Sequence, residues 1–364
     1  MLKNKKNTYR LPITLVVFFS ILAGIAMLIG LSKLGDSTVL RENVGETSIP
    51  DISDIQDVNT VTESDPFAAL TIPYLRNRSY TSKLGERELL STATRYERFI
   101  TNYDSDGLQI NALLTVPTAT IPEDGWPAIV FIHGYIPPNQ YRTQEKYEEY
   151  VDYLARNGFV VLKIDLRGHG NSEGTASGSY YSGDYIIDTL NARAALASSE
   201  FVNPDAIGLW GHSMAGNIVL RSVAAQQNIP AAVIWAGAVY TYEDFMEYGI
   251  SDSSYQRPGE GSPRSQERQA LFAEHGEFDA SKPFWQSIVP TNYMEGVTTK
   301  LQLHHASNDS VVPIDYSTNL DQVLDSTEVD HEVFEYSSGG HNISGSSFSQ
   351  AMQRTVDFFK EELQ

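Results

Sequence analysis

A short segment near the middle of the chain, Gly211-His-Ser213-Met-Ala215-Gly216, holds a serine between residues with little or no side chain. An apolar run typical of a strand ends just before it at Trp210, and a run compatible with a helix starts at Asn217. A strand, a sharp turn and a helix in this order describe a nucleophile elbow, which exposes a serine hydroxyl at the end of a sheet. The last position of G-x-S-x-G is alanine here, so the motif needs support from other residues.

Such support comes from two later loops. A serine hydroxyl is a weak nucleophile until a base takes its proton, and that base needs an acid to orient it. Asp309 follows a predicted strand at 301–305, and His341 follows the last predicted strand. In an α/β sheet, loops of this kind gather at the carboxyl ends of the strands. The order Ser, Asp, His is also that of one large class of hydrolases, so we predict Ser213, Asp309 and His341 as a catalytic triad.

Other titratable residues have simpler interpretations. Asp315 is an alternative acid, but it lies near the start of the next predicted helix, where a carboxylate is favoured anyway. His304 and His305 are neighbours on a strand and therefore point to opposite faces, so we interpret both as structural. His331 shows no spacing typical of metal ligands. We predict neither a metal nor another cofactor.

Acyl transfer also requires hydrogen-bond donors for the negative charge that develops on the substrate oxygen. One donor is expected to be the backbone N–H of Met214, directly after the serine. The second should come from the loop after the third predicted strand, His133-Gly134-Tyr135. We predict the backbone N–H of Tyr135, with Gly134 allowing a close turn.

The elements that must position these groups alternate along the chain. Two alternating segments around Asp104-Ser-Asp-Gly107 predict a hairpin. Six further strands are expected, with helical patterns between them, and this alternation indicates a mainly parallel sheet covered on both faces. The expected strands are 95–103, 108–116, 128–132, 159–164, 206–210, 231–236, 301–305 and 332–336, and the expected helices are 143–157, 183–199, 214–227, 315–325 and 347–362.

Charge and hydropathy divide the chain further. The 364 residues include no cysteine and carry a formal charge of −20, so a polyanion such as nucleic acid is excluded as a partner. Four basic residues precede Leu11–Leu31, which is uncharged and long enough to span a bilayer. No small-x-small cleavage site follows, which favours an uncleaved signal anchor over a cleaved signal peptide. The basic flank predicts a single-pass protein of the cell membrane, with its N-terminus in the cytoplasm and the catalytic domain outside it.

We therefore predict four regions. Residues 1–31 form the cytoplasmic N-terminus and transmembrane anchor, 32–66 an acidic flexible stalk, 67–93 a strap, and 94–364 the catalytic domain. About 60 residues between the sixth and seventh strands, 240–299, exceed a simple crossover and form an insertion. We expect some of its aromatic residues to line a substrate pocket; the candidates are Tyr240, Tyr242, Phe245 and Trp285.

From about Tyr96 to Leu363 the sequence resembles an α/β-hydrolase, and more narrowly the catalytic domain of the prolyl oligopeptidase family of serine peptidases. The resemblance rests on Ser105-Asp-Gly107, His133-Gly134-Tyr135, Asp165-Leu-Arg-Gly-His-Gly170, Gly211–Gly216, His305–Pro313 and Gly340-His341. Ala215 and Ala306 replace glycines of the family pattern, and too few residues precede the domain for that family's β-propeller.

The resemblance implies an eight-stranded α/β-hydrolase fold and a serine peptidase. Without the propeller, neither that family's preference for proline nor its restriction to short peptides can be carried over, and the expected substrate is a small peptide or ester. A carboxylesterase of the same fold is the alternative, since ester and peptide bonds need the same catalytic groups. An inactive hydrolase fold that serves as a binding module is a third hypothesis, although no triad residue is missing. The sequence does not indicate an oligomeric state.

Overall fold

The computed structural model describes residues 65–363, whose strands form one nine-stranded sheet. Its strands are β1 (Glu88–Thr92), β2 (Tyr96–Ser105), β3 (Leu108–Pro117), β4 (Trp126–Ile132), β5 (Val160–Ile164), β6 (Val202–His212), β7 (Ala231–Trp235), β8 (Lys300–Ala306) and β9 (His331–Tyr336). They lie in the order β1-β2-β3-β5-β4-β6-β7-β8-β9. The pairs from β1 to β5 are antiparallel, and all pairs from β5 across to β9 are parallel.

Eight of these strands, β2 to β9, correspond to the eight expected from the sequence. The mainly parallel sheet is therefore confirmed, but the expected number of strands is corrected from eight to nine. The additional strand, β1, falls inside the segment 67–93 that was interpreted as a strap. It lies at the sheet edge and is mostly exposed, so it lacks the alternation of buried and exposed residues that identifies a strand.

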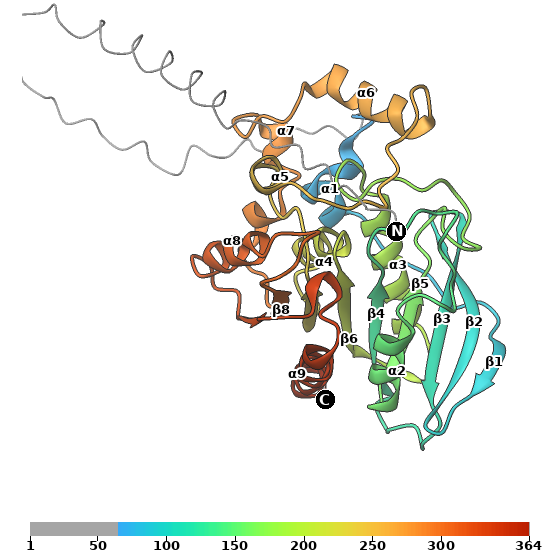
Figure 1. Cartoon of the computed structure of the whole chain (residues 1–364). Coiled ribbons are helices and arrows are strands. Elements are labelled where there is room, and N and C mark those ends of the chain that lie inside the picture. The colour runs from blue at the N-terminus through green and yellow to red at the C-terminus, as the bar shows by residue number, and fades with distance from the viewer. Residues whose placement is uncertain (1–64, 364) are drawn as a thin grey trace, which may run out of the picture. The chain divides into compact units, whose positions relative to one another are not determined.

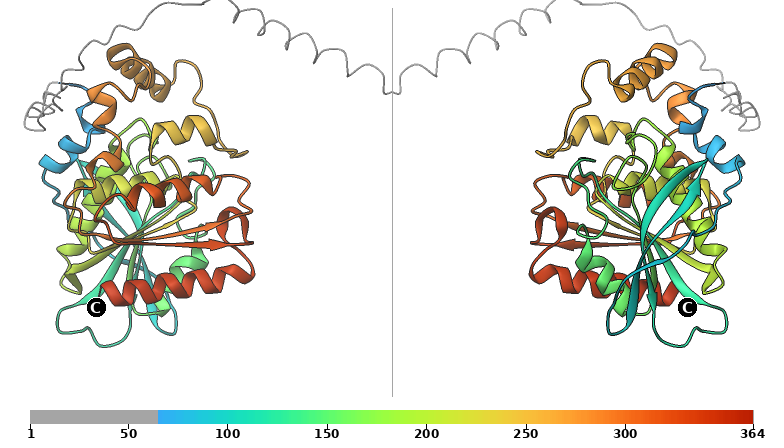
Figure 2. Two further views of the ribbon diagram at one scale, coloured as in Figure 1. Left: turned by 90° about the vertical axis from the view of Figure 1, so that its left-hand side faces the viewer. Right: turned by 90° about the vertical axis from the view of Figure 1, so that its right-hand side faces the viewer.

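Helices cover both faces of the sheet (Figures 1 and 2). Helices α2 (Glu148–Arg156) and α9 (Ser346–Glu362) pack on one face. The other face carries α1 (Ile72–Asn77), α3 (Asp184–Ala197), α4 (Ala215–Ala225) and α8 (Asp315–Leu324). The central strands β5 and β7 are buried along their whole length. This explains their continuous apolar sequence, since both of their faces are covered.

The insertion between β7 and β8 contributes α5 (Tyr242–Tyr248), α6 (Pro263–His275) and α7 (Pro283–Gln286). Within residues 65–363 there are also three short 3₁₀ helices: η2 (Ala68–Leu70) before β1, η3 (Pro290–Tyr293) inside the insertion and η4 (Gly340–Asn342) after β9. The start of the described chain packs against the insertion. Phe67 and Leu70 share a small hydrophobic cluster with Trp285, and the Ile72 N–H donates to the Ser287 carbonyl at 2.8 Å. Residues 67–77 are thus part of the folded domain.

The predicted anchor, residues 1–31, and almost all of the predicted stalk lie outside the described residues. Within 65–363, every helix is too short or too polar to cross a bilayer.

Candidate active site

Ser213 lies between the end of β6 and the start of α4. Its φ angle is 58°, a left-handed conformation that is unusual for a residue other than glycine. The turn is held by backbone hydrogen bonds on both sides. The Ser213 N–H donates to the Trp235 carbonyl at 2.9 Å, and the Gly216 N–H donates to the Ser213 carbonyl at 2.8 Å. The serine therefore has the strained, well-supported backbone that a nucleophile elbow requires.

The small residues around Ser213 are explained by close packing. A Cβ atom at Gly211 would lie 2.7 Å from the Val219 side chain, and one at Gly216 would lie 2.6 Å from the Cα of Gly237. Both positions therefore require glycine. Ala215 is fully buried and its methyl group fits without such a clash, so alanine at the last position of the motif keeps the elbow intact.

A chain of hydrogen bonds joins the three residues predicted as a triad. The Nε2 atom of His341 lies 2.9 Å from the Ser213 Oγ, and its Nδ1 atom lies 2.8 Å from the Asp309 Oδ2. An ionised carboxylate only accepts hydrogen bonds, so the imidazole proton must be on Nδ1. Nε2 then accepts from the serine hydroxyl. The chain thus has the polarity with which an imidazole can remove the serine proton.

Asp309 is buried and fully engaged by hydrogen-bond donors. Its Oδ1 accepts from the N–H groups of Val311 and Val312 at 2.8 and 3.0 Å, and the Nε2 of His305 lies 3.3 Å from Oδ2. Burial alone raises the pKa of the Asp309 carboxyl, but the hydrogen bonds from His305 and His341 outweigh it and hold the pKa well below its ordinary value. Asp309 is therefore ionised at neutral pH.

The loop after β9 holds His341 in a tight turn. Gly339 and Gly340 have φ angles of 121° and 58°, and Ile343 has a φ angle of 46°. The Gly340 N–H donates to the Asn308 side chain at 2.9 Å, which ties this loop to the one that carries Asp309. The glycine pair is thus required by backbone conformation.

The predicted oxyanion donors are the backbone N–H groups of Tyr135 and Met214. The Gly134 carbonyl accepts from the His133 ring at 2.7 Å. In a trans peptide the next N–H, that of Tyr135, points the opposite way. The Ser213 carbonyl likewise accepts a hydrogen bond from the Gly216 N–H in α4. The next N–H, that of Met214, therefore points away from this carbonyl. Neither N–H has a hydrogen-bond partner among residues 65–363. The geometry fits the predicted oxyanion hole, whose role stays a prediction.

A buried polar cluster supports the segment that follows the oxyanion loop. Asp165 accepts from the Tyr141 hydroxyl and the Asn111 amide, both at 2.6 Å, and from the Thr143 hydroxyl. Lys163 donates to the Thr143 carbonyl at 2.5 Å. Burial lowers the pKa of Lys163 to about 8 and raises the pKa of Asp165. These contacts anchor the chain between β4 and α2 to the sheet.

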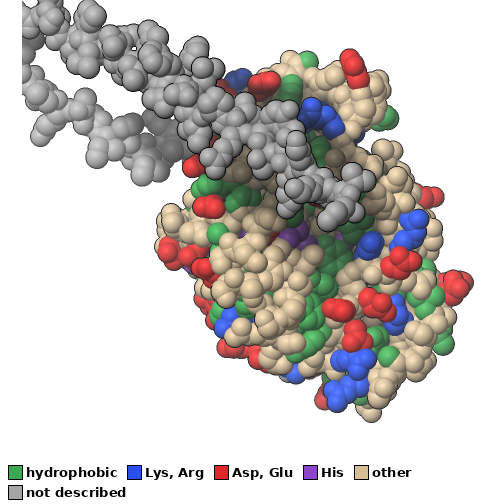
Figure 3. Space-filling view, in the orientation of Figure 1, with side chains coloured by type: hydrophobic (Ala, Val, Ile, Leu, Met, Phe, Trp, Pro, Cys, Tyr) green, Lys and Arg blue, Asp and Glu red, His purple; other side chains and the backbone are tan. Residues whose placement is uncertain are grey.

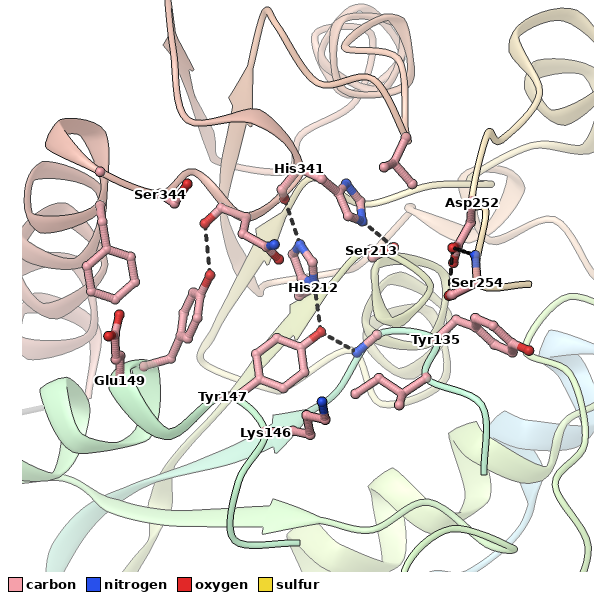
Figure 4. A pocket seen from close by; sticks show the side chains of 17 residues that line it. Tyr135, Lys146, Tyr147, Glu149, His212, Ser213, Asp252, Ser254, His341 and Ser344 are labelled. Atoms are coloured by element: carbon pink, nitrogen blue, oxygen red, sulfur yellow. Dashed lines mark hydrogen bonds between the residues drawn. The ribbon is translucent and has the colours of Figure 1, made fainter. Parts of the chain in front are cut away.

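Ser213 and His341 line a cavity of about 710 Å³. Figure 3 shows histidine near the centre of this face, bordered by hydrophobic side chains, and Figure 4 shows the residues around Ser213. Aromatic and charged side chains share the wall; they are Tyr135, Tyr147, Tyr150, Phe348, Lys146, Glu149 and Asp252. The Tyr135 hydroxyl accepts from the Gln256 N–H of the insertion at 2.9 Å. The insertion therefore borders the cavity.

The four aromatic residues expected in the substrate pocket do not line this cavity, which corrects that expectation. Tyr240 belongs to the main core, and Tyr242 and Trp285 belong to the small core of the insertion. Phe245 packs against Tyr180. Tyr242 and Trp285 therefore hold the insertion together, whereas Tyr240 and Phe245 pack against the main core.

The remaining candidates lie away from the serine. Asp315 is the exposed first residue of α8, where its negative charge interacts favourably with the helix dipole. His304 is buried and hydrogen-bonded to Tyr336. Within 65–363, one group of side chains could offer three metal-ligand atoms close together, His331 with Asp321 and Asp325. It does not border the cavity, and His331 Nε2 is already 3.1 Å from an Asp321 oxygen.

Sequence comparison links part of the chain to known hydrolases. The family described as serine aminopeptidase, S33, matches residues 127–252, a stretch that contains Ser213 but neither Asp309 nor His341. An uncharacterized peptidase of Bacillus subtilis is 23% identical over 296 residues, which cover 76% of this chain and 42% of the relative. The chain thus spans less than half the length of the curated relatives it matches.

Solved structures show the same fold at low identity. An acetyl xylan esterase from Paenibacillus sp. R4 has a TM-score of 0.58 and 18% identity, and the match covers 85% of this chain and 99% of the esterase. An acylaminoacyl peptidase of Pyrococcus horikoshii has a TM-score of 0.55 and 19% identity over 74% of this chain and 42% of the peptidase. The α/β-hydrolase fold predicted from the sequence, and the resemblance to serine peptidases of that fold, are confirmed.

Proposed function

We propose that this serine hydrolase of the α/β-hydrolase fold cleaves a peptide or ester bond through an acyl-enzyme formed on Ser213. The observation that carries the proposal is the hydrogen-bonded chain from Asp309 through His341 to the Ser213 hydroxyl. His341 Nε2 takes the serine proton while Oγ bonds to the substrate carbonyl carbon. The N–H groups of Tyr135 and Met214 stabilise the resulting oxyanion.

The second half of the reaction uses the same groups. The protonated His341 gives its proton to the leaving amine or alcohol as the bond to the acyl carbon breaks. A water molecule then attacks the acyl-enzyme, and His341 removes a proton from that water. When the Ser213 oxygen leaves, it regains a proton from His341. Asp309 keeps the imidazole oriented and stabilises its positive form at each step.

A prolyl oligopeptidase-like serine peptidase is our first choice of activity. Its support is the sequence resemblance and the match to a family described as aminopeptidase. An esterase is the alternative, favoured by the match over nearly the full length of acetyl xylan esterases. Both bonds place a carbonyl above the same serine, so the triad geometry supports the two activities equally.

A substrate panel tests the proposal. The full chain is assayed with short acyl esters of p-nitrophenol and with free and N-acylated aminoacyl arylamides, and Ser213 labelling by a fluorophosphonate is measured by mass spectrometry. Arylamide turnover assigns a peptidase, and turnover of esters alone assigns an esterase. Absence of both turnover and labelling would overturn the proposal in favour of the binding-module hypothesis.

For localisation we propose a membrane anchor at residues 11–31 with the catalytic domain outside the cytoplasm. Its support is the sequence alone: Lys3, Lys5, Lys6 and Arg10 before 21 uncharged residues. We expect protease added to spheroplasts to digest a C-terminal epitope tag. Protection of the tag until the membrane is permeabilised would contradict this orientation.

A further inference from the structure

Three tyrosines recur at a spacing of three at the start of α2: Tyr147 lies directly before the helix, and Tyr150 and Tyr153 lie within it. The first two reach the site. The Tyr147 hydroxyl lies 2.8 Å from His212 Nδ1, and the Tyr150 hydroxyl donates to the Asn342 carbonyl at 2.8 Å. Tyr153 instead donates to Gln353 on α9 at 3.1 Å. This segment therefore places two tyrosine hydroxyls at the site and a third away from it.

The contacts of Tyr147 form a continuous chain through His212 (Figure 4). The Gly134 N–H donates to the Tyr147 oxygen at 3.0 Å, and the His212 Nε2 atom is 2.8 Å from the His341 carbonyl oxygen. A carbonyl only accepts, so His212 must carry its proton on Nε2. Its Nδ1 then accepts, and the Tyr147 hydroxyl donates to it. Each bond in the chain thus has one defined direction.

This chain connects the three parts of the proposed machinery. Gly134 directly precedes the predicted oxyanion donor, and His212 directly precedes the predicted nucleophile. The carbonyl at its far end belongs to His341, the predicted base. No other hydrogen bond among residues 65–363 joins the backbone or side chain of His212 to the His341 loop.

The arrangement is crowded and rigid. His212 is almost fully buried, and a Cβ atom at Gly134 would lie 2.9 Å from the Tyr147 oxygen. Tyr147 itself has a φ angle of 60°, a left-handed conformation that persists only where its contacts fix it. Burial, and then the neighbouring His341, lowers the pKa of His212 to about 3. His212 therefore stays neutral at neutral pH, and the direction of the chain is preserved.

We propose that Tyr147 and His212 are positioning residues that hold the oxyanion loop, the nucleophile and the base in register. Neither residue touches the reacting atoms; both act through Gly134 and His341. The inference rests on the proposed function, because it concerns the same reaction.

The test compares Tyr147→Phe with Tyr153→Phe, which removes a tyrosine hydroxyl from the adjoining helix without touching the site. Phenylalanine at 147 leaves the Gly134 N–H and His212 Nδ1 without partners, so the loops shift. We expect kcat to fall about 10- to 100-fold, since a misplacement of about 1 Å can cost about 100-fold. KM is expected to change little, and the Tm to fall by a few degrees because the two polar groups lose their partner. Tyr153→Phe is expected to match the kcat of wild type.

A second pair of variants tests His212. Glutamine at 212 can place an N–H near the former Nε2 and keep the bond to His341, whereas alanine cannot. We expect His212→Gln to retain about tenfold more kcat than His212→Ala. The fluorophosphonate labelling rate of Ser213 should follow the same order as kcat.

Two results would overturn the inference while the proposed function stands: Tyr147→Phe with the kcat of Tyr153→Phe, or equal kcat for His212→Gln and His212→Ala. A wild-type protein that neither turns over substrate nor reacts with the fluorophosphonate would instead overturn the proposed function, and this inference with it.

Discussion

The Ser213→Ala variant is expected to lose about 10⁴- to 10⁶-fold in kcat, the range seen when a serine nucleophile is removed. Alanine deletes the one hydroxyl that the His341 Nε2 atom contacts at 2.9 Å. It keeps the Cβ atom, so the packing of the elbow is preserved. Residual hydrolysis should come from the oxyanion donors and substrate binding alone. The measurements are kcat and KM on the best panel substrate, with Tm as a control for folding.

Ser254 provides the matched control for this variant. It lines the same cavity, and its hydroxyl is bonded within the insertion to Asp252 at 2.7 Å. Ser254→Ala removes a cavity hydroxyl that contacts the Asp252 carboxylate and not His341, so its effect should be far smaller. Wild-type kcat in Ser213→Ala, with fluorophosphonate still bound, would refute the assignment of Ser213 as nucleophile.

Much of the fold could be predicted because its strands are buried on both faces and read as apolar runs. The carboxyl ends of parallel strands meet at one edge of the sheet, so the positions of the loops that follow them can be predicted. Asp309, His341 and Ser213 lie on such loops, and their proximity could therefore be predicted too. The edge strand β1 could not be predicted in this way. Its residues are mostly exposed, and it is defined by backbone pairing with β2, which leaves no hydrophobic pattern in the sequence.

The supporting residues of the site were also not predicted. His212 occupies the variable position of the elbow motif, and Tyr147 precedes a helix, so only their three-dimensional contact shows the connection. The recurrence of tyrosine every three residues from Tyr147 to Tyr153 was the one usable signal in this segment. His305 was interpreted as structural, but it also contacts Asp309. The aromatics of the insertion were misplaced because sequence cannot separate the wall of a pocket from a small hydrophobic core.

The Asp309→Asn variant is expected to lower kcat about 10⁴-fold, the size of effect measured when a triad aspartate is replaced by its amide. The Asn oxygen can still accept from Val311 and Val312, so its Nδ2 group should face His341. That amide donates, and the His341 Nδ1 must then accept and move its proton to Nε2. A protonated Nε2 cannot take the serine proton, even though the three residues remain in place.

The same variant gives a pH signature in stability. The folded-state pKa of Asp309 lies below its unfolded value, so the carboxylate stabilises the fold above the unfolded pKa of about 3.9. This stabilisation is lost as the pH falls through the folded-state pKa. Denaturant unfolding should therefore show Asp309→Asn as less stable than wild type at neutral pH, with a difference that shrinks on acidification below about pH 4.

Asp315→Asn separates the role of Asp309 from a general effect of charge. It removes the same charge from the exposed first residue of α8, six positions further along the chain. We expect wild-type kcat and only a small loss of stability from the helix dipole. A large loss of kcat in Asp315→Asn together with an active Asp309→Asn would reassign the orienting acid. Because the Asp309 carboxylate contacts His341 at 2.8 Å, we expect an inactive Asp309→Asn variant and an active Asp315→Asn variant.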